Sequence, residues 1–266
     1  MANRCRCRMP CAPGLAADMP LWLEAGAWGF VAASALLLGS ALGWFIRFPP
    51  KTVAYVMAFG SGVLFAALSF DLVGDALKQA GMGWIAGGFM AGAAGFSLIN
   101  HLLNTPGVKH RKRSHSQHPV TKNTGIAIAA GTLLDGLPES MAIGLLVASG
   151  GKLSLATIAA IFISNIPEAL SSTAGMRRAG HGGWFMLRLW GGMALLSGVF
   201  AIIGAVFFGG APEHIKALIT CVAAGGIFAM LVETMVPEAF AETHELSGLI
   251  TAFGFMVAVA MQALEV

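Results

Sequence analysis

Acidic side chains recur inside long apolar stretches of this sequence, where a charge is costly. These acids are Asp71, Asp75, Asp135, Glu139, Glu168, Glu233 and Glu238. At the centre of a bilayer each carboxylate costs a few kcal/mol, and an ionisable residue in such a position is by default a candidate functional group. A series of them, nearly all acidic, predicts one shared role.

The spacing of these acids suggests what the role is. Polar residues four positions apart form the pairs Asp71/Asp75, Asp135/Glu139, Ser164/Glu168 and Thr234/Glu238. Side chains four residues apart project from one face of a helix, so each pair is predicted to point toward a common bundle axis. Adjacent carboxylates repel each other, and a cation between them removes that penalty. Carboxylate oxygens accept divalent metal ions, including Zn²⁺.

Proline stands directly before glutamate at three of these sites. The motifs are "DGLPES" (135–140), "SNIPEA" (164–169) and "TMVPEA" (234–239). Pro138 cannot donate to the carbonyl of Leu134, and Pro167 cannot donate to that of Ile163. Each break therefore frees an oxygen beside an acid. Irregular backbone at membrane depth is tolerated where it lines a cavity, and paired broken helices are typical of a transport site.

The overall composition is that of a membrane protein. The chain has 266 residues, of which 56% are hydrophobic and 11% charged, against about 25% charged in an average soluble domain. Its mean hydropathy is +0.75. Lipid offers no partner to open backbone groups, which predicts an all-α integral membrane fold. The 35 glycines favour close helix packing and would allow a homodimer. The net charge of +3 gives no reason to expect a nucleic-acid partner.

Eight membrane-spanning helices are predicted. They cover about 23–46, 52–77, 82–104, 123–149, 153–176, 184–209, 214–237 and 246–265. The chain is accordingly divided into an N-terminal tail (1–22), the first three spans (23–104), a polar loop (105–122) and the last five spans with the metal site (123–266). The tail contains Cys5, Cys7 and Cys11, whose role the sequence leaves open.

The polar loop fixes the expected orientation. It is rich in lysine and arginine, and basic loops stay in the cytoplasm. The even-numbered spans then run outward, and both termini lie outside the cytoplasm. Without organelle signals, the expected location is a prokaryotic plasma membrane, as a multi-pass protein. The loop also contains His110, His115 and His118, which could capture metal weakly or simply belong to a solvated basic loop.

The motifs resemble those of the ZIP (Zrt/Irt-like) family of divalent metal transporters. The family's fourth-span motif, H-N-x-P-E-G, is similar to "DGLPES", with Asp135 at the histidine position. Its fifth-span motif, H-x-x-P-E-G, is similar to "SNIPEA", with Ser164 at the histidine position. Its second-span pattern is similar to "GSGVLFAALSFDLVGDAL" (60–77), with Asp71 and Asp75 in place of histidine and glutamate. The resemblance covers most of the chain beyond residue 23.

This resemblance implies an eight-helix bundle of the ZIP type with a transport site between the fourth and fifth helices. Glu139 and Glu168 would be its common acids, with Asp135, Ser164 and Asn165 as matching neighbours. The chain departs from the family in having no histidine at any of these positions. Its sixth span also offers no acid, so a two-metal centre is not expected.

The absence of imidazole shifts the expected ligands toward oxygen. Carboxylate, carbonyl and water suit Mn²⁺ and Mg²⁺, whereas imidazole suits Zn²⁺, Fe²⁺ and copper. Three carboxylates with a hydroxyl or amide still complete a Zn²⁺ shell. The predicted cargo is therefore a divalent transition metal, Zn²⁺ first and Mn²⁺ or Fe²⁺ next, with Cd²⁺ as a surrogate. No resident cofactor is expected.

The predicted mechanism begins with an acidic funnel open to the outside, built partly from Asp71, Asp75 and Glu238. Glu233 is assigned to the same pathway. Glu139 and Glu168 then bind the ion at mid-depth, and one helix bundle moves against another to release it into the cytoplasm. Protons would compete for the same carboxylates.

Two other functions are compatible with parts of the pattern, and a third is not expected. A proton-coupled transporter of a small solute would use the acids as proton relays. A metal-binding membrane sensor would bind the ion without moving it. An intramembrane enzyme is not expected, because the chain lacks the HExxH and GxSxG motifs.

Overall fold

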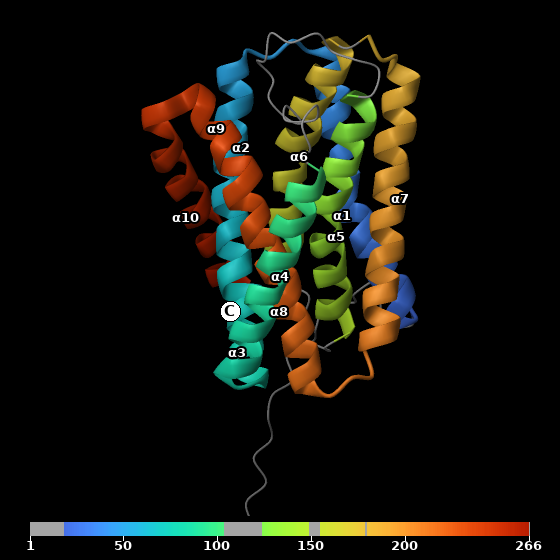
Figure 1. Ribbon diagram of the computed structural model, residues 1–266, viewed down its shortest axis with the longest axis vertical. Coiled ribbons are helices and arrows are strands. Elements are labelled where there is room, and N and C mark those ends of the chain that lie inside the picture. Colours follow the sequence, from blue (N-terminus) through green and yellow to red (C-terminus); the bar gives the residue numbers. More distant parts are fainter. Residues whose placement is uncertain (1–18, 104–123, 149–154, 179, 266) are drawn as a thin grey trace, which may run out of the picture.

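The computed structural model describes residues 19–103, 124–148, 155–178 and 180–265, and these ranges form an α-helical bundle without strands (Figure 1). The predicted all-α class is confirmed. The N-terminal cysteines lie outside the described residues, and so do the loop histidines His110, His115 and His118.

The helices begin and end close to the predicted boundaries. The elements are α1 (Leu21–Phe45), α2 (Pro50–Ala67), η1 (Leu68–Val73), α3 (Gly74–Gln79), α4 (Met82–Leu103), α5 (Thr124–Ala148), α6 (Leu155–Arg178), α7 (Gly183–Phe208), α8 (Glu213–Met230), η2 (Leu231–Met235), α9 (Val236–Thr243), η3 (His244–Leu246) and α10 (Ser247–Glu265). Prolines mark two of the starts. Pro50 is the first residue of α2, and Pro212 directly precedes α8, where a missing backbone N–H is harmless.

Six helices in the described part of the chain are long and apolar enough to cross a membrane. They are Leu21–Phe45, Pro50–Gln79, Met82–Leu102, Gly183–Phe208, Glu213–Thr243 and Ser247–Leu264. Within α5, the stretch Gly136–Ala148 is apolar but shorter than a membrane span. The multi-pass class is therefore supported, while the predicted count of eight spans depends on α5 and α6, the two helices that hold the predicted metal site.

Each of the two longest spans contains a π-helical turn. The first span runs through η1 from α2 into α3, and the other runs through η2 from α8 into α9. A π turn inserts an extra residue into the hydrogen-bond ladder and rotates the side chains that follow it. Asp71 lies in η1 and Asp75 after it, while Glu233 lies in η2 and Glu238 after it.

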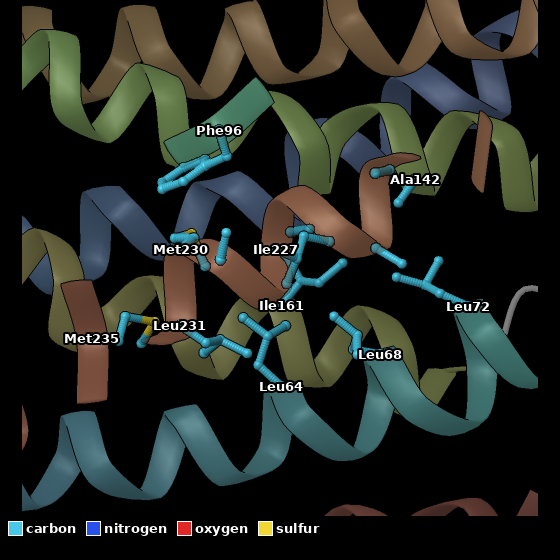
Figure 2. Close-up of a cluster of buried hydrophobic side chains, with 14 of the residues drawn as sticks. Leu64, Leu68, Leu72, Phe96, Ala142, Ile161, Ile227, Met230, Leu231 and Met235 are labelled. Carbon is cyan, nitrogen blue, oxygen red and sulfur yellow. The ribbon is translucent and has the colours of Figure 1, made fainter. Parts of the chain in front are cut away.

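An apolar core joins these two long helices. Leu64 of α2 and Leu68 of η1 pack with Ile227 and Met230 of α8, and Ile161 of α6 belongs to the same cluster (Figure 2). The outer faces of the helices instead carry exposed large apolar side chains, as expected for a surface in contact with lipid.

Close backbone contacts at glycine tie α2 to α10 and α4 to α8. A Cβ atom at Gly62 would lie 1.9 Å from the carbonyl oxygen of Thr251 in α10. A Cβ atom at Gly92 would lie 1.9 Å from the carbonyl oxygen of Val222 in α8. No side chain fits at such distances, so only glycine permits these helix pairs. We call α2, α3, α4, α8, α9, α10 and the turns η1 and η2 the frame bundle.

The remaining long helices, α1, α5, α6 and α7, are locked together in the same way, and we call them the site bundle. A Cβ atom at Gly39 of α1 would lie 2.2 Å from the carbonyl oxygen of Ile166 in α6, and one at Gly144 of α5 would lie 2.2 Å from that of Ala201 in α7. Where α5 meets α8 the contact is wider, since a Cβ atom at Gly226 would lie 3.2 Å from the Pro138 ring.

Candidate metal-binding site

A row of buried polar side chains runs along one face of α6. Its members are Thr157, Ser164, Asn165, Glu168, Ser171 and Ser172. Their spacings of three, four and seven residues place them on the same side of the helix. Since buried polar groups need partners, this face must lie against other polar groups or a polar cavity. We call it the polar track of α6.

The first cavity on this track lies between α1, α5, α6 and α7. Glu139, which is only 4% exposed, lines it together with Asn165. Gly29, Ala32 and Ala33 of α1 form its opposite wall, and their small side chains leave space there. The cavity measures about 20 Å³, which is enough for a single water molecule or ion.

Polar groups around this cavity are held by the backbone. The Asn165 amide donates to the carbonyl oxygen of Ala32 at 3.3 Å. The Ser140 hydroxyl donates to the carbonyl oxygen of Gly136 at 2.7 Å. Amide and hydroxyl oxygens can still accept or ligate after such donation. The site thus offers a carboxylate, an amide oxygen and a hydroxyl oxygen around a small space.

The second cavity lies farther along the polar track, between the two bundles. Its lining residues are Met57, Glu168, Ser172, Thr234, Met235 and Glu238. It measures about 10 Å³. The Ser171 hydroxyl donates a hydrogen bond to the Glu238 carboxylate, which ties α6 to α9. Glu139 and Glu168 were predicted to share one site, but each lines a cavity of its own. Asn165 of the first cavity and Glu168 of the second lie about 5 Å apart along the axis of α6, at a rise of 1.5 Å per residue.

Two predicted ligands, Ser164 and Asp135, are not among the described lining residues of either cavity. Ser164 is buried, but its hydroxyl donates to the carbonyl oxygen of Ile161 at 2.9 Å, and it lines neither cavity. The side chain of Asp135 lies outside the described residues, although its helix is described.

The predicted outer funnel is wrong, because its acids lie at opposite ends of the bundle. Asp71 accepts a hydrogen bond from Thr157 near the start of α6, and Glu238 accepts one from Ser171. These two α6 residues are about 21 Å apart at 1.5 Å per residue. Figure 1 shows the same separation, with α3 at one end of the bundle and α9 at the other. The cause is that α2–α3 and α8–α9 run in opposite directions.

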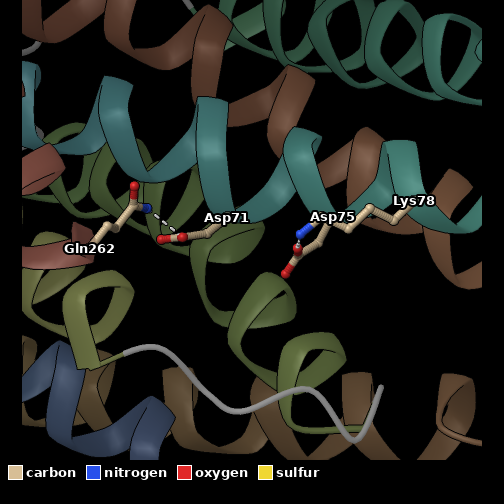
Figure 3. Close-up of polar contacts among 4 residues, drawn as sticks. All are labelled: Asp71, Asp75, Lys78 and Gln262. Carbon is tan, nitrogen blue, oxygen red and sulfur yellow. Dashed lines mark hydrogen bonds and ion pairs between the residues drawn. The ribbon is translucent and has the colours of Figure 1, made fainter. Parts of the chain in front are cut away.

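Asp71 and Asp75 lie four residues apart but have different partners. Asp71 accepts hydrogen bonds from Thr157 and from Gln262 of α10, whereas Asp75 pairs with Lys78 at 2.7 Å on the exposed side of α3 (Figure 3). Asp71 lies within the π turn η1, and Asp75 lies in the first turn of α3. Asp71 therefore belongs to one end of the polar track, and Asp75 does not.

Glu233 is likewise placed away from the polar track. It is exposed in η2, and it accepts hydrogen bonds from Ser97 and Asn100 of α4, the latter at 2.7 Å. Its side chain is engaged with α4 within the frame bundle, and its assignment to the pathway stays a prediction.

A metal ion would depend on mixed donors. Among the residues that the structure describes, no three His, Cys, Asp or Glu side chains come together. Each cavity instead combines carboxylate with hydroxyl, and the first adds an amide. Sequence reasoning missed Thr157, Ser171 and Ser172, although their spacing from Glu168 was a signal that could have identified them. Met57 and Met235 gave no such signal, because methionine in an apolar helix is ordinary.

No protein-family model matches the chain, and a search of curated proteins also finds no match. The site geometry and the motifs are therefore the basis for assigning a function.

Proposed function

We propose that the protein transports divalent transition-metal ions across the plasma membrane toward the cytoplasm, with Zn²⁺ as the first candidate and Mn²⁺ and Fe²⁺ next. One observation carries the proposal. Buried Glu139 and Glu168 line successive cavities along the polar track of α6, which extends from Asp71 at one end of the bundle to Glu238 at the other.

Acidic groups in this order suit a cation that moves in steps. An ion in the first cavity would meet Glu139 and the Asn165 oxygen, and an ion in the second would meet Glu168 and Glu238. Conduction through sequential sites requires binding that is strong enough for arrival and weak enough for departure. Two small sites with few carboxylates each suit this requirement better than one closed cage.

The motifs support the same function. "DGLPES" and "SNIPEA" resemble the ZIP motifs of the fourth and fifth spans, and Pro138 and Pro167 both lie inside helices, α5 and α6. In this proposal α5 and α6 complete an eight-span bundle of the ZIP type with both termini outside the cytoplasm. A homodimer would be compatible with it.

The division into two bundles supports a moving-bundle mechanism. Glycine contacts hold the helices of each bundle close together. The bundles meet through the shared apolar core, the approach of Gly60 in α2 to the backbone of α6, and the hydrogen bonds from Thr157 to Asp71 and from Ser171 to Glu238. Movement of the site bundle against the frame bundle would expose the ion alternately to the two sides. The hydrogen bonds at the two ends would break and re-form during this movement.

The test is uptake of Zn²⁺, Mn²⁺ and Fe²⁺ into proteoliposomes containing the full chain. Glu139→Gln and Glu168→Gln should each abolish most uptake, because each removes a negative charge from a cavity. Glu213→Gln, at the exposed start of α8, is the matched control and should transport normally. Equal uptake by all four proteins would contradict the site assignment. Metal binding without uptake would identify a sensor, and uptake of a small solute with protons would identify the other alternative.

A further inference from the structure

Two methionines line the second cavity beside its carboxylates. Met57 comes from α2 and Met235 from η2, and each is only 3% exposed. Glu168 of α6 and Glu238 of α9 line the same space. Four elements from both bundles thus bring thioethers and carboxylates to one cavity.

These methionines have a packing role as well. Both belong to the main apolar cluster, in which Met235 lies near Leu231 (Figure 2). Methionine commonly fills irregular gaps in such cores. Here, however, both methionines also line a cavity that two glutamates share.

The remaining polar groups of the cavity are already oriented. The Thr234 hydroxyl donates to the carbonyl oxygen of Met230 at 2.6 Å, and the Ser171 hydroxyl donates to Glu238. The carboxylate of Glu238 is thereby held toward α6, where Glu168 and Ser172 lie. A cation in this cavity would find hard oxygen atoms on the α6 and α9 sides and a thioether on the α2 and η2 sides.

Sulfur and oxygen ligands discriminate among divalent metals. Thioether and thiolate ligands select soft or borderline ions, a class that includes Zn²⁺, whereas carboxylate, carbonyl and water suit Mn²⁺ and Mg²⁺. We propose that Met57 and Met235 determine the metal preference of the transport path, favouring Zn²⁺ and Cd²⁺ over Mn²⁺. This inference rests on the proposed function, and it narrows the cargo that oxygen ligands alone leave open.

The experiment compares Zn²⁺ and Mn²⁺ uptake by the full chain in proteoliposomes for the wild type, Met57→Leu, Met235→Leu and the double variant. Leucine is close to methionine in volume, so the core is retained. In the double variant the ratio of Zn²⁺ to Mn²⁺ uptake should fall by about tenfold, a change within the range seen when metal surroundings are altered. Met230→Leu, buried in the same core but lining neither cavity described above, should keep the wild-type ratio.

Equilibrium binding of Zn²⁺ and Mn²⁺ to the same purified proteins gives a second readout that does not need flux. An unchanged ratio in the double variant, or an equal loss of both ions, would overturn the inference in either assay. A wild type that binds Zn²⁺ in preference to Mn²⁺ but moves neither ion would instead refute only the transport proposal. The two failures are therefore distinguishable.

Discussion

The Thr157 hydroxyl of α6 donates a hydrogen bond to the Asp71 carboxylate in η1. This bond joins the site bundle to the frame bundle at the end of the molecule where α3 lies (Figure 1). Gln262 of α10 donates to the same carboxylate (Figure 3). One acid therefore connects helices from both bundles.

Loss of the hydrogen bond between Thr157 and Asp71 should lower the stability of the folded protein. The energetic coupling between the two residues can be measured. In a double-mutant cycle with Thr157→Val and Asp71→Ala, followed by thermal unfolding in detergent, we expect an interaction energy of about 1 kcal/mol, as for interhelical hydrogen bonds in membranes. The cycle separates the bond from the cost of each single change. Strictly additive effects would show that the bond does not stabilise this state.

Gly92→Ala should destabilise the frame bundle. The added methyl group would lie 1.9 Å from the carbonyl oxygen of Val222, so α4 and α8 must separate, at a cost of about 1–3 kcal/mol for overpacking. Gly95→Ala on the same helix is the control, because a Cβ atom there would have no neighbour within 4 Å. Thermal unfolding should show a lower midpoint for Gly92→Ala alone. Equal midpoints would contradict the close packing of these helices.

Two glutamates on one long helix should behave differently. Glu238→Gln removes a charge from the second cavity and should reduce Zn²⁺ uptake strongly. Glu233 lies on the side that faces α4, so Glu233→Gln should leave uptake near the wild-type rate. The measurement is initial uptake at subsaturating Zn²⁺, normalised to the amount of reconstituted protein. Similar losses in both variants would show that the two acids act in one pathway after all.

Zn²⁺ uptake should fall as the pH is lowered. Metal ligands must be deprotonated, so protons and metal compete for the same carboxylates. Acid neutralises Glu139 and Glu168, which raises the Zn²⁺ concentration needed for half-maximal uptake, while saturating Zn²⁺ restores the rate. Initial rates over a grid of pH and Zn²⁺ concentrations test this. Uptake that rises steadily toward acid, with Glu139 intact, would indicate that protons drive transport instead.

The helices could be predicted from the sequence because long apolar runs leave few alternatives in lipid. The π turns could not be predicted, because one extra residue in a helix leaves no mark in the local composition. They lie beside acids, with Asp71 in η1 and Glu233 in η2. The helix of Glu139, α5, instead continues through Pro138.

The site could be predicted only in part. Glu139, Asn165 and Glu168 were predicted from their motifs, and each lines a cavity, because local spacing determines which side chains share a helix face. Their role as metal ligands stays a prediction. The meeting of Glu168 with Glu238 depends on how α6 packs against α9, and the contribution of Met57 depends on α2. Such long-range packing is not encoded in any one segment, so neither could be found from spacing.

The polarity of α6 also bears on how the protein is made. A helix that carries Asn165, Glu168 and several serines would not leave the translocon for lipid by itself. Gly39, whose missing side chain lets α6 approach the backbone of α1, belongs to a helix synthesised earlier. If α6 could not pack against α1 in a newly made chain, those polar groups would face the hydrocarbon of the bilayer. Such chains would become targets for membrane quality-control proteases.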